Sequence, residues 1–185
     1  MTISVLRRSV EGLALGVVLA AAPALAEPPL TVDPQIRWLA RGLFCPPDET
    51  GRREAPDTMA GWIHVPEGPI EMVAESAVAP AALGLGFGVW FRLRGLVPSE
   101  LRFEVHHPPM GAQGVTMQSW TNLSNPMAGD AVLFQFDLPE ELVTGPWEFR
   151  AFEGATELFR AGFTVVPPGE APDLVALCRP GAMLS

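Results

Sequence analysis

The chain has 185 residues, of which 21 are acidic and 12 are arginine, and its net charge at pH 7 is −9. This acidic balance disfavours binding to nucleic acid phosphates and to anionic lipid surfaces. The sequence contains no lysine and no tyrosine. Schiff-base chemistry on lysine and general acid catalysis by tyrosine are therefore excluded.

Residues 1–26 have the pattern of a cleaved secretory signal peptide. An arginine pair precedes an uncharged apolar segment over residues 12–22, and Ala24-Leu25-Ala26 is a small-x-small cleavage site. The apolar run is shorter than the roughly 20 residues that a membrane-spanning helix needs. Abundant alanine, glycine, proline and arginine without lysine is typical of a GC-rich bacterium. We expect a mature chain that begins at Glu27 and is periplasmic or secreted, with the general secretory route favoured over the twin-arginine route.

Two cysteines, Cys45 and Cys178, remain in the mature chain, and they do not form a C-x-x-C pair. Structural zinc binding and redox catalysis are therefore disfavoured. In an oxidising compartment we expect one disulfide between them, which would tether a C-terminal tail over residues 167–185. Two separate buried thiols are the alternative.

The first half of the mature chain shows short apolar runs separated by proline and glycine, which is typical of a β-sandwich or barrel. In chain order we expect an extension over 27–34, a strand Ile36–Phe44, a polar loop Asp48–Asp57, and a hairpin of Met59–Val65 with Ile70–Ser76 across 66–69.

The clearest strand is Leu85–Arg94, in which bulky apolar residues alternate with glycine, tryptophan and arginine. Gly86 and Gly88 lie within it, and we expect them to make room for a bulky neighbour such as Trp62 or Trp120. Two further strands are indicated by Leu101, Phe103 and Val105, and by Leu133–Asp137.

The last two strands form a hairpin around Gly154. The predicted register places Trp147 opposite Ala161 and Phe149 opposite Phe159, with a three-residue loop, Glu153-Gly154-Ala155. It also sets Glu148 opposite Arg160. We expect Trp147, Phe149, Phe163, Phe91 and Phe87 to be buried, and Glu148, Arg150 and Arg92 to be exposed.

About eight strands with this spacing predict an all-β fold, an immunoglobulin-like antiparallel β-sandwich over residues 35–166. A small closed barrel is the alternative. Four stretches carry a resemblance to a known family: Gly42-Leu43-Phe44-Cys45, Pro80 to Val89, His107-Pro108-Pro109-Met110, and Gly145 to Phe149 with Phe163-Thr164-Val165. Over residues 43–166 the chain resembles a bacterial family catalogued as a domain of unknown function (number 3859). The resemblance implies the sandwich architecture and carries no activity that could be transferred.

His106, His107 and Met110 form the cluster with metal-ligand chemistry, since imidazole and thioether together suit copper. Neighbouring residues on a strand point to opposite faces, however, so His106 and His107 would share an ion only if the chain broke at Pro108-Pro109. We favour a strand end at these prolines, with His107 packed or hydrogen-bonded and no metal bound. We expect His64 to be a single, partly exposed side chain.

Sequence motifs for catalysis are missing. No serine lies in a G-x-S-x-G context, and there is neither an H-E-x-x-H motif nor a phosphate-binding glycine loop. Asp137, Glu140 and Glu141 could form an acid/base pair, but a solvated strand end explains them more simply. We therefore expect no enzyme activity and no cofactor.

The segment Pro109 to Asp130 is long for a sandwich connection and polar, and long loops often carry binding sites. Within this segment we expect a strand over Val115 to Trp120. The candidate binding residues are Pro109, Met117, Trp120 and Asn122.

Together these features predict an exported, non-catalytic binding module for an unidentified protein or envelope component. It would bind no nucleic acid and would keep no membrane span after signal cleavage. The first alternative is a small periplasmic copper-handling protein that uses His106, His107 and Met110, and the second is an enzyme with an unrecognised site.

Overall fold

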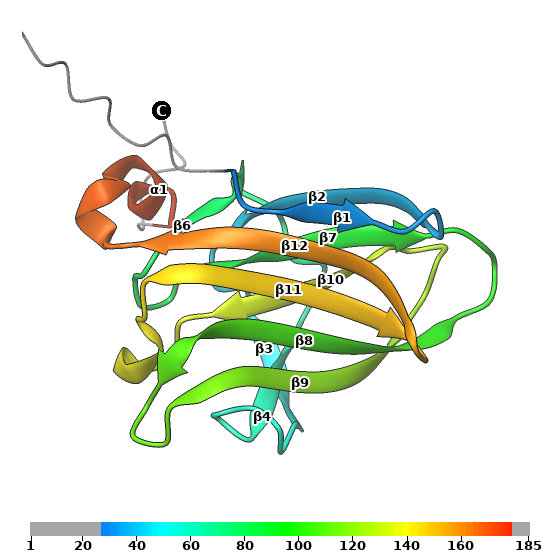
Figure 1. The fold of residues 1–185 in the computed structure, drawn as a ribbon, viewed down its shortest axis with the longest axis horizontal. Coiled ribbons are helices and arrows are strands. Elements are labelled where there is room, and N and C mark those ends of the chain that lie inside the picture. Colours follow the sequence, from blue (N-terminus) through cyan, green and yellow to red (C-terminus); the bar gives the residue numbers. More distant parts are fainter. Residues whose placement is uncertain (1–26, 179–185) are drawn as a thin grey trace, which may run out of the picture.

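A computed structural model describes residues 27–178 of the chain. The predicted signal peptide and its cleavage site lie outside the described residues, as does the end of the C-terminal tail. The described part is all-β, with two sheets packed face to face and a separate hairpin at one side (Figure 1). The predicted fold class, an antiparallel immunoglobulin-like sandwich, is confirmed.

The first sheet has the strand order β1-β12-β11-β8-β9, and β6 pairs with β12 beside β1. The pairing of β6 with β12 is parallel, and the other strand pairs of the molecule are antiparallel. The strands are β1 (Leu30–Val32), β6 (Val78–Pro80), β8 (Ser99–Met110), β9 (Val115–Ser124), β11 (Gly145–Glu153) and β12 (Thr156–Val166). The segment 27–34, expected as an extension, thus contributes β1 to this sheet.

The second sheet has the order β10-β7-β2-β5, and β3 pairs only with β4. Its strands are β2 (Ile36–Phe44), β5 (Ala74–Glu75), β7 (Gly86–Leu93) and β10 (Asp130–Gln135), and the hairpin consists of β3 (Glu49–Glu54) and β4 (Trp62–Pro66). Three short helices complete the described chain: η1 (Pro139–Glu141), η2 (Pro168–Glu170) and α1 (Pro172–Ala176).

Residues 48–66 differ from the sequence prediction in two ways. The expected polar loop Asp48–Asp57 contains β3, and the partner of β4 is β3 rather than Ile70–Ser76. All six residues of β3 are exposed, so no apolar alternation marks this strand. β5, within Ile70–Ser76, pairs instead with β2.

The core lies between the two sheets, and Phe87 is at its centre. The ring of Phe87 contacts five other aromatic rings at centroid distances of 5.2–6.1 Å, those of Phe134, Phe136, Trp147, Phe149 and Phe163. The predicted burial of Trp147, Phe149, Phe163, Phe91 and Phe87 is confirmed.

The expected full exposure of Glu148, Arg150 and Arg92 is wrong, because all three are half-buried. On the outer face of the first sheet, the Glu148 carboxylate pairs with Arg150 and lies 4.0 Å from the Arg160 guanidinium. These contacts hold the charged side chains against the sheet surface. Arg92 donates to the carbonyl of Ala128 at 3.4 Å.

The bulky neighbour at Gly86 is Phe44, not Trp62 or Trp120. A Cβ atom at position 86 would lie 2.0 Å from the Phe44 ring. At Gly88 the close neighbour is the backbone of β10, since a Cβ atom there would lie 2.2 Å from the Val132 carbonyl oxygen. Each glycine therefore allows a close approach that any side chain would block.

The predicted register of the β11–β12 hairpin is wrong by two residues. In the first part of β11, each residue pairs with a residue two positions further along β12 than predicted. Trp147 lies opposite Phe163, Phe149 opposite Ala161, and Arg150 opposite Arg160. The pairing shifts next to Ala151, which leaves Leu158 as an extra residue in β12 and shortens the turn to Gly154-Ala155. Gly154 has φ of 57°, as this tight turn requires. The shift is even, so the large side chains stay on the inner face.

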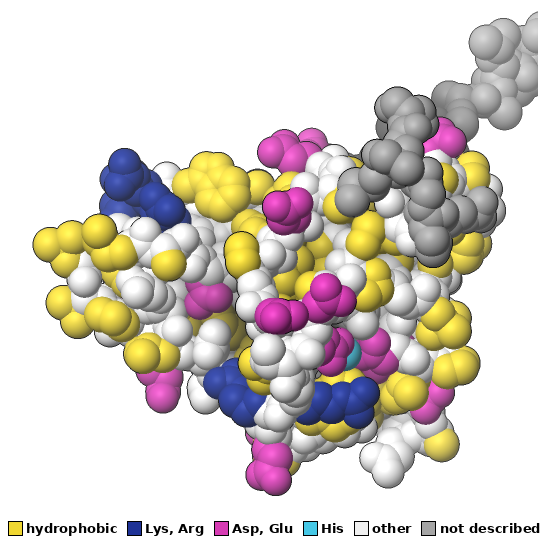
Figure 2. Space-filling view, turned by 180° about the vertical axis from the view of Figure 1, so that it is seen from behind, with side chains coloured by type: hydrophobic (Ala, Val, Ile, Leu, Met, Phe, Trp, Pro, Cys, Tyr) yellow, Lys and Arg dark blue, Asp and Glu magenta, His cyan; other side chains and the backbone are white. Residues whose placement is uncertain are grey.

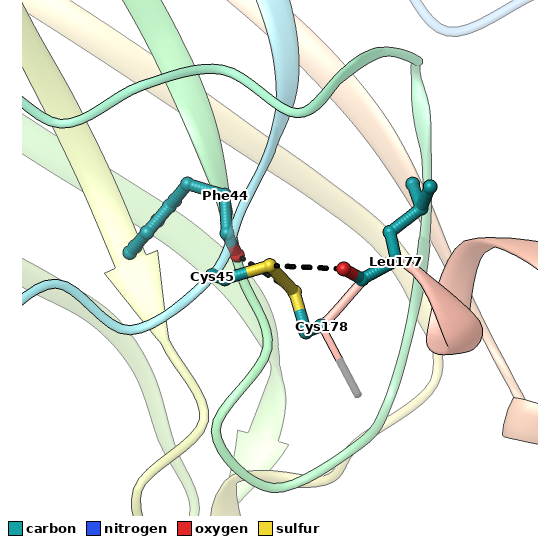
Figure 3. Close-up of a disulfide and its surroundings, with 4 residues drawn as sticks. All are labelled: Phe44, Cys45, Leu177 and Cys178. Carbon is teal, nitrogen blue, oxygen red and sulfur yellow. Dashed lines mark hydrogen bonds between the residues drawn. A yellow bond between two sulfur atoms is a disulfide. The ribbon is translucent and has the colours of Figure 1, made fainter. Parts of the chain in front are cut away.

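A disulfide joins Cys45, just after β2, to Cys178, just after α1 (Figure 3). The Cα atoms are 5.1 Å apart, within the range that a disulfide spans without backbone rearrangement. The predicted bridge is therefore confirmed. It ties residues 167–178, which contain η2 and α1, to the second sheet.

Candidate binding cleft

The β3–β4 hairpin lies over the side of the sandwich where both sheets end, at β9 and β10 (Figure 1). Its turn is fixed to β9 by a hydrogen bond from the Ser119 N–H to the Asp57 carbonyl, at 3.1 Å. The guanidinium of Arg53, on β3, donates to the Thr121 carbonyl at 3.2 Å and to the Asn122 side chain at 3.3 Å. The hairpin is therefore attached along β9.

On the opposite side the hairpin is attached through His64, which lies between two carboxylates. Its Nε2 lies 2.6 Å from Oδ2 of Asp137, just after β10, and its Nδ1 contacts the carboxylate of Glu49, on β3. The hydrogen bond to Asp137 raises the pKa of His64, although partial burial acts in the other direction. The ring of His64 thus bridges the hairpin and the second sheet.

The pKa of Asp137 reflects the same arrangement. Burial would raise it, but the hydrogen bonds from His64 and from the Gln135 side chain, the latter at 2.7 Å, hold it below its ordinary value. The two opposite pKa shifts therefore widen the pH range in which His64 and Asp137 are both charged.

A cleft with a volume of about 830 Å³ lies between the hairpin, the segment after β4 and strands β7, β9 and β10. Its aromatic lining includes four of the five tryptophans: Trp38, Trp62, Trp90 and Trp120. The Trp90 indole N–H donates to the Ile70 carbonyl at 2.9 Å and holds the segment after β4 over the outer face of the second sheet. Figure 2 shows this side of the molecule, where histidine lies among acidic side chains with arginine nearby.

The segment from Pro109 to Asp130 is not one long loop, because ten of its residues, Val115–Ser124, form β9. The strand expected over Val115 to Trp120 is confirmed, and a binding role for this segment stays a prediction. Of the candidate residues, Trp120 and Asn122 line the cleft, whereas Pro109 and Met117 do not. Alternation along β9 explains this separation: Trp120 and Asn122 lie on the cleft side, two residues apart.

The structure does not bring His106 and His107 together. His106 lies on the outer face and its Nε2 is 2.8 Å from the Glu104 carboxylate, whereas His107 is buried and its Nε2 is 3.2 Å from the Gln118 amide. The expected strand end at Pro108-Pro109 is wrong. These prolines lie in a bulge of β8, where pairing jumps from His106 to Met110, and bulges tolerate residues that cannot donate.

The interpretation of the carboxylates after β10 as a solvated strand end is wrong for two of the three. Asp137 is half-buried beside His64, and Glu141 is only 4% exposed. The Glu141 carboxylate accepts backbone N–H bonds from Asp137 and Leu138 at 2.7 and 2.9 Å, and burial still raises its pKa. Glu140 is exposed as expected.

The sequence prediction missed His64 and Arg53 as cleft residues, and Glu49 as a partner of His64. His64 was expected to be a single side chain, since its partners are 15 and 73 residues away along the chain. A sequence signal did exist, because Glu49 and Arg53 lie in a charged hexapeptide that pairs with the strand of His64. That hexapeptide has no alternation of apolar residues, so hydrophobic periodicity does not reveal its pairing with β4.

The described residues contain no group of three or more His, Cys, Asp or Glu side chains placed to hold a metal ion. Between residues 27 and 178, no helix has the length and apolar character required to cross a membrane.

Two packed sheets, a central aromatic core and a cleft beside the β3–β4 hairpin define an immunoglobulin-like sandwich. The chain belongs to the family described as Domain of unknown function (DUF3859), whose model matches residues 32–165. An immunoglobulin-like protein from Pseudomonas aeruginosa, solved as a crystal structure, is similar with 20% identity and a TM-score of 0.49. That match covers 76% of this chain and 99% of the other. No curated protein matches the chain.

Proposed function

We propose that this protein is an exported, non-catalytic binding module that holds part of a protein or envelope component in the cleft beneath the β3–β4 hairpin. The cleft itself is the observation that carries the proposal. Its volume of about 830 Å³ is in the range of ligand sites, and its lining combines tryptophan rings with a few polar groups. Tryptophan is among the residues that dominate binding energy at interfaces.

The arrangement around His64 favours binding over catalysis. Asp137 contacts one ring nitrogen and Glu49 the other. A general base needs a free nitrogen within reach of a substrate proton. Because both nitrogens are occupied by carboxylates, His64 serves to fix the hairpin.

Export is supported by two independent features. The pattern of residues 1–26 is that of a signal peptide, and the disulfide between Cys45 and Cys178 is a bond that persists in oxidising compartments. N-terminal sequencing of the protein from the periplasm or medium of an expressing bacterium should start at Glu27. A chain with Met1 intact in the membrane fraction would contradict export.

Photo-crosslinking in the exporting bacterium tests the cleft directly. A benzophenone amino acid replaces Ile63, which lines the cleft, and the control position is Thr31 on the exposed strand β1. We expect a discrete adduct from position 63 and none of the same mass from position 31. The adduct should disappear when the purified protein is added in excess as a competitor.

The chemistry of the adduct is then determined by protease and muramidase digestion followed by mass spectrometry. A protein or cell-wall adduct at Ile63 supports the proposed function. Equal labelling from both positions, or none from Ile63 in a folded variant, would show that the cleft is not a binding site.

A further inference from the structure

The backbone of β10 has one edge paired with β7 and one edge that points into the cleft. The N–H of Phe136 donates to the Leu85 carbonyl at 3.1 Å, and the Phe136 carbonyl accepts from Gly84 at 2.8 Å. Backbone groups of an antiparallel strand alternate in direction. The residues of β10 whose N–H and C=O groups point away from β7 are therefore Ala131, Leu133 and Gln135.

These are cleft residues, since Ala131, Leu133 and Gln135 all line it. Among residues 27–178, β10 pairs with no strand except β7. The N–H of Ala131 is bonded at 2.8 Å to the carboxylate of Asp130, its own neighbour. The cleft thus contains a short free strand edge, which is a template for an added strand.

Strand β9, on the other wall, offers no such edge. Its outward Ser119 N–H is bonded to Asp57, and its outward Thr121 carbonyl accepts from Arg53. The hairpin therefore covers the edge of β9 and leaves that of β10 open. Within the cleft, β10 therefore offers the free edge that belongs to the sandwich itself, whereas β4 of the hairpin pairs only with β3.

The charges in the cleft indicate what kind of chain would enter. Arg37, Arg53 and Arg92 line it, and within the described residues none of the three forms an ion pair. By contrast, Arg102, Arg150 and Arg160 on the outer face of the first sheet are all paired with glutamate.

The acidic side chains of the cleft are already engaged by other groups. Asp137 is neutralised by His64, and Glu141 accepts two backbone N–H groups. Burial raises the pKa of Asp130, which also accepts from Ala131. Arg37 and Arg53 are exposed, whereas Glu141 is buried and Asp130 is half-buried, so the accessible charge that lines the cleft is mainly positive. Charge complementarity favours a ligand with carboxylates.

We propose that the occupant of the cleft is an extended, acidic polypeptide segment of a partner protein, which adds as a strand to the free edge of β10. This inference rests on the proposed function of the cleft and specifies its ligand. Main-chain hydrogen bonds to Leu133 and Gln135 would supply affinity. The arginines would select acidic side chains, and the tryptophans would contact the alternate side chains of the added strand.

The test uses the oxidised mature chain and a display library of peptides of about eight to twelve residues, long enough to pair with the six residues of β10. We expect bound peptides to be enriched in aspartate and glutamate. Two variants at position 133 then distinguish binding through the backbone of β10 from binding through the side chain. Leu133→Pro removes the outward N–H and leaves the ladder to β7 intact, whereas Leu133→Ala removes only side-chain atoms.

For the strongest peptide we expect Leu133→Pro to weaken binding about tenfold or more and Leu133→Ala to weaken it about threefold or less. Both variants are first checked for an unchanged fold by circular dichroism and melting. If Leu133→Pro does not fold, N-methylation of the peptide backbone replaces it. Strand addition then predicts loss of binding at every second peptide position.

A second matched pair of variants tests the preference of the cleft for an acidic ligand. Arg37→Glu, at an exposed arginine that lines the cleft, should weaken binding of the acidic peptide about tenfold. Arg94→Glu makes the same charge change at an exposed arginine outside the cleft, and it should change binding less than about twofold. Equal effects of the two variants would overturn the choice of an acidic ligand.

Cell-wall glycan fragments are tested in parallel. If they bind at the cleft, as judged by the Ile63 crosslink, and Leu133→Pro does not affect their binding, the polypeptide inference is wrong while the proposed function stands. If neither peptides nor glycans label the cleft, both proposals fail.

Discussion

The two sides of the sandwich differ in their strand edges: on one side the edge is covered by further strands, and on the other it is unpaired. On one side the outer edge of β12 is fully covered, by β1 over residues 159–161 and by β6 over residues 164–166. The disulfide then ties the following tail to β2. On the other side β10 has an unpaired edge, and a hairpin stands over it without pairing with it.

Arg41 strengthens the covered side from within. Its guanidinium is only 12% exposed and donates to the carbonyls of Pro28 and Gly162, at 3.1 and 2.9 Å. One side chain of β2 thus clamps the N-terminal segment onto β12 of the facing sheet. Hydrogen bonds to charged groups are stronger than neutral ones when partly buried, so this clamp makes the covered side rigid.

This difference between the two sides shows how a strand edge can remain unpaired without causing aggregation. A long exposed edge invites pairing with other chains, and proteins usually cover it. Here β10 is shielded by the β3–β4 hairpin, which is attached through His64 and Arg53. Side chains of the hairpin, such as Trp62 and Ile63, line the cleft beside this edge.

The largest expected effect is on the core that both sides share. Phe87 is fully buried among five aromatic rings from β10, β11 and β12 and the segment after β10. Phe87→Ala should lower the free energy of unfolding by about 3–5 kcal/mol, through lost burial and a cavity. Chemical denaturation measures this. The control is Trp38→Ala, at a side chain that is 53% exposed, which should cost less than about 1 kcal/mol.

The second prediction separates the two sides. The disulfide closes a loop of 133 residues, and replacing both Cys45 and Cys178 by serine should cost about 2–4 kcal/mol. Hydrogen exchange should accelerate first in α1 and β6. Protection of β10 and of the hairpin should fall only with global unfolding. Early loss of protection in the hairpin would contradict the independence of the two sides.

A smaller effect is expected where β12 meets the N-terminal segment. A Cβ atom on Gly162 would lie 2.7 Å from the Pro29 ring, so Gly162→Ala should displace β1 and cost about 1–3 kcal/mol. Limited proteolysis near residue 30 should report the displacement. The matched control is Gly154→Ala, which is also strained, at φ of 57°, but has open space around it and lies away from β1. Equal cleavage near residue 30 in the two variants would refute the argument.

The core and the disulfide were predictable from the sequence, whereas β1 and β6, which cover the edge of β12, were not. Alternation over Leu85–Arg94 and over the two last strands indicated their inner faces, and two cysteines after a predicted signal peptide predicted the bridge. The register of the last hairpin was missed because the extra residue, Leu158, is as apolar as its neighbours. A bulge of this kind leaves the alternation on both sides of it intact.

The open side could not be predicted in the same way. β3 is wholly polar, and the attachment of its hairpin depends on single contacts across the chain, such as His64 with Asp137. Periodicity reports burial, and these residues are held by charge and by backbone pairing instead. Trp120 and Asn122, selected from the sequence as candidate binding residues, line the cleft as members of β9, and their role in binding stays a prediction.

The smallest expected effect concerns pH and the attachment of the hairpin. The folded-state pKa of His64 is raised above its ordinary value of 6.5 by Asp137 and Glu49. The stabilisation is therefore complete below the ordinary pKa and is lost as pH rises through the raised pKa. Partly exposed ion pairs contribute about 1 kcal/mol or less.

Global melting would obscure this change, because burial lowers the pKa of His107 and gives the opposite pH dependence. The lowered pKa of Asp137 acts only near and below pH 3.8, where its stabilisation is lost as pH falls. Hydrogen exchange in β3 and β4, corrected for intrinsic rates, should therefore show more opening as pH rises above 6.5. His64→Gln should remove this pH dependence and leave the protection of β1 and β12 unchanged. If the hairpin of the unmodified protein is equally protected at all pH values, His64 does not attach the hairpin to the segment after β10.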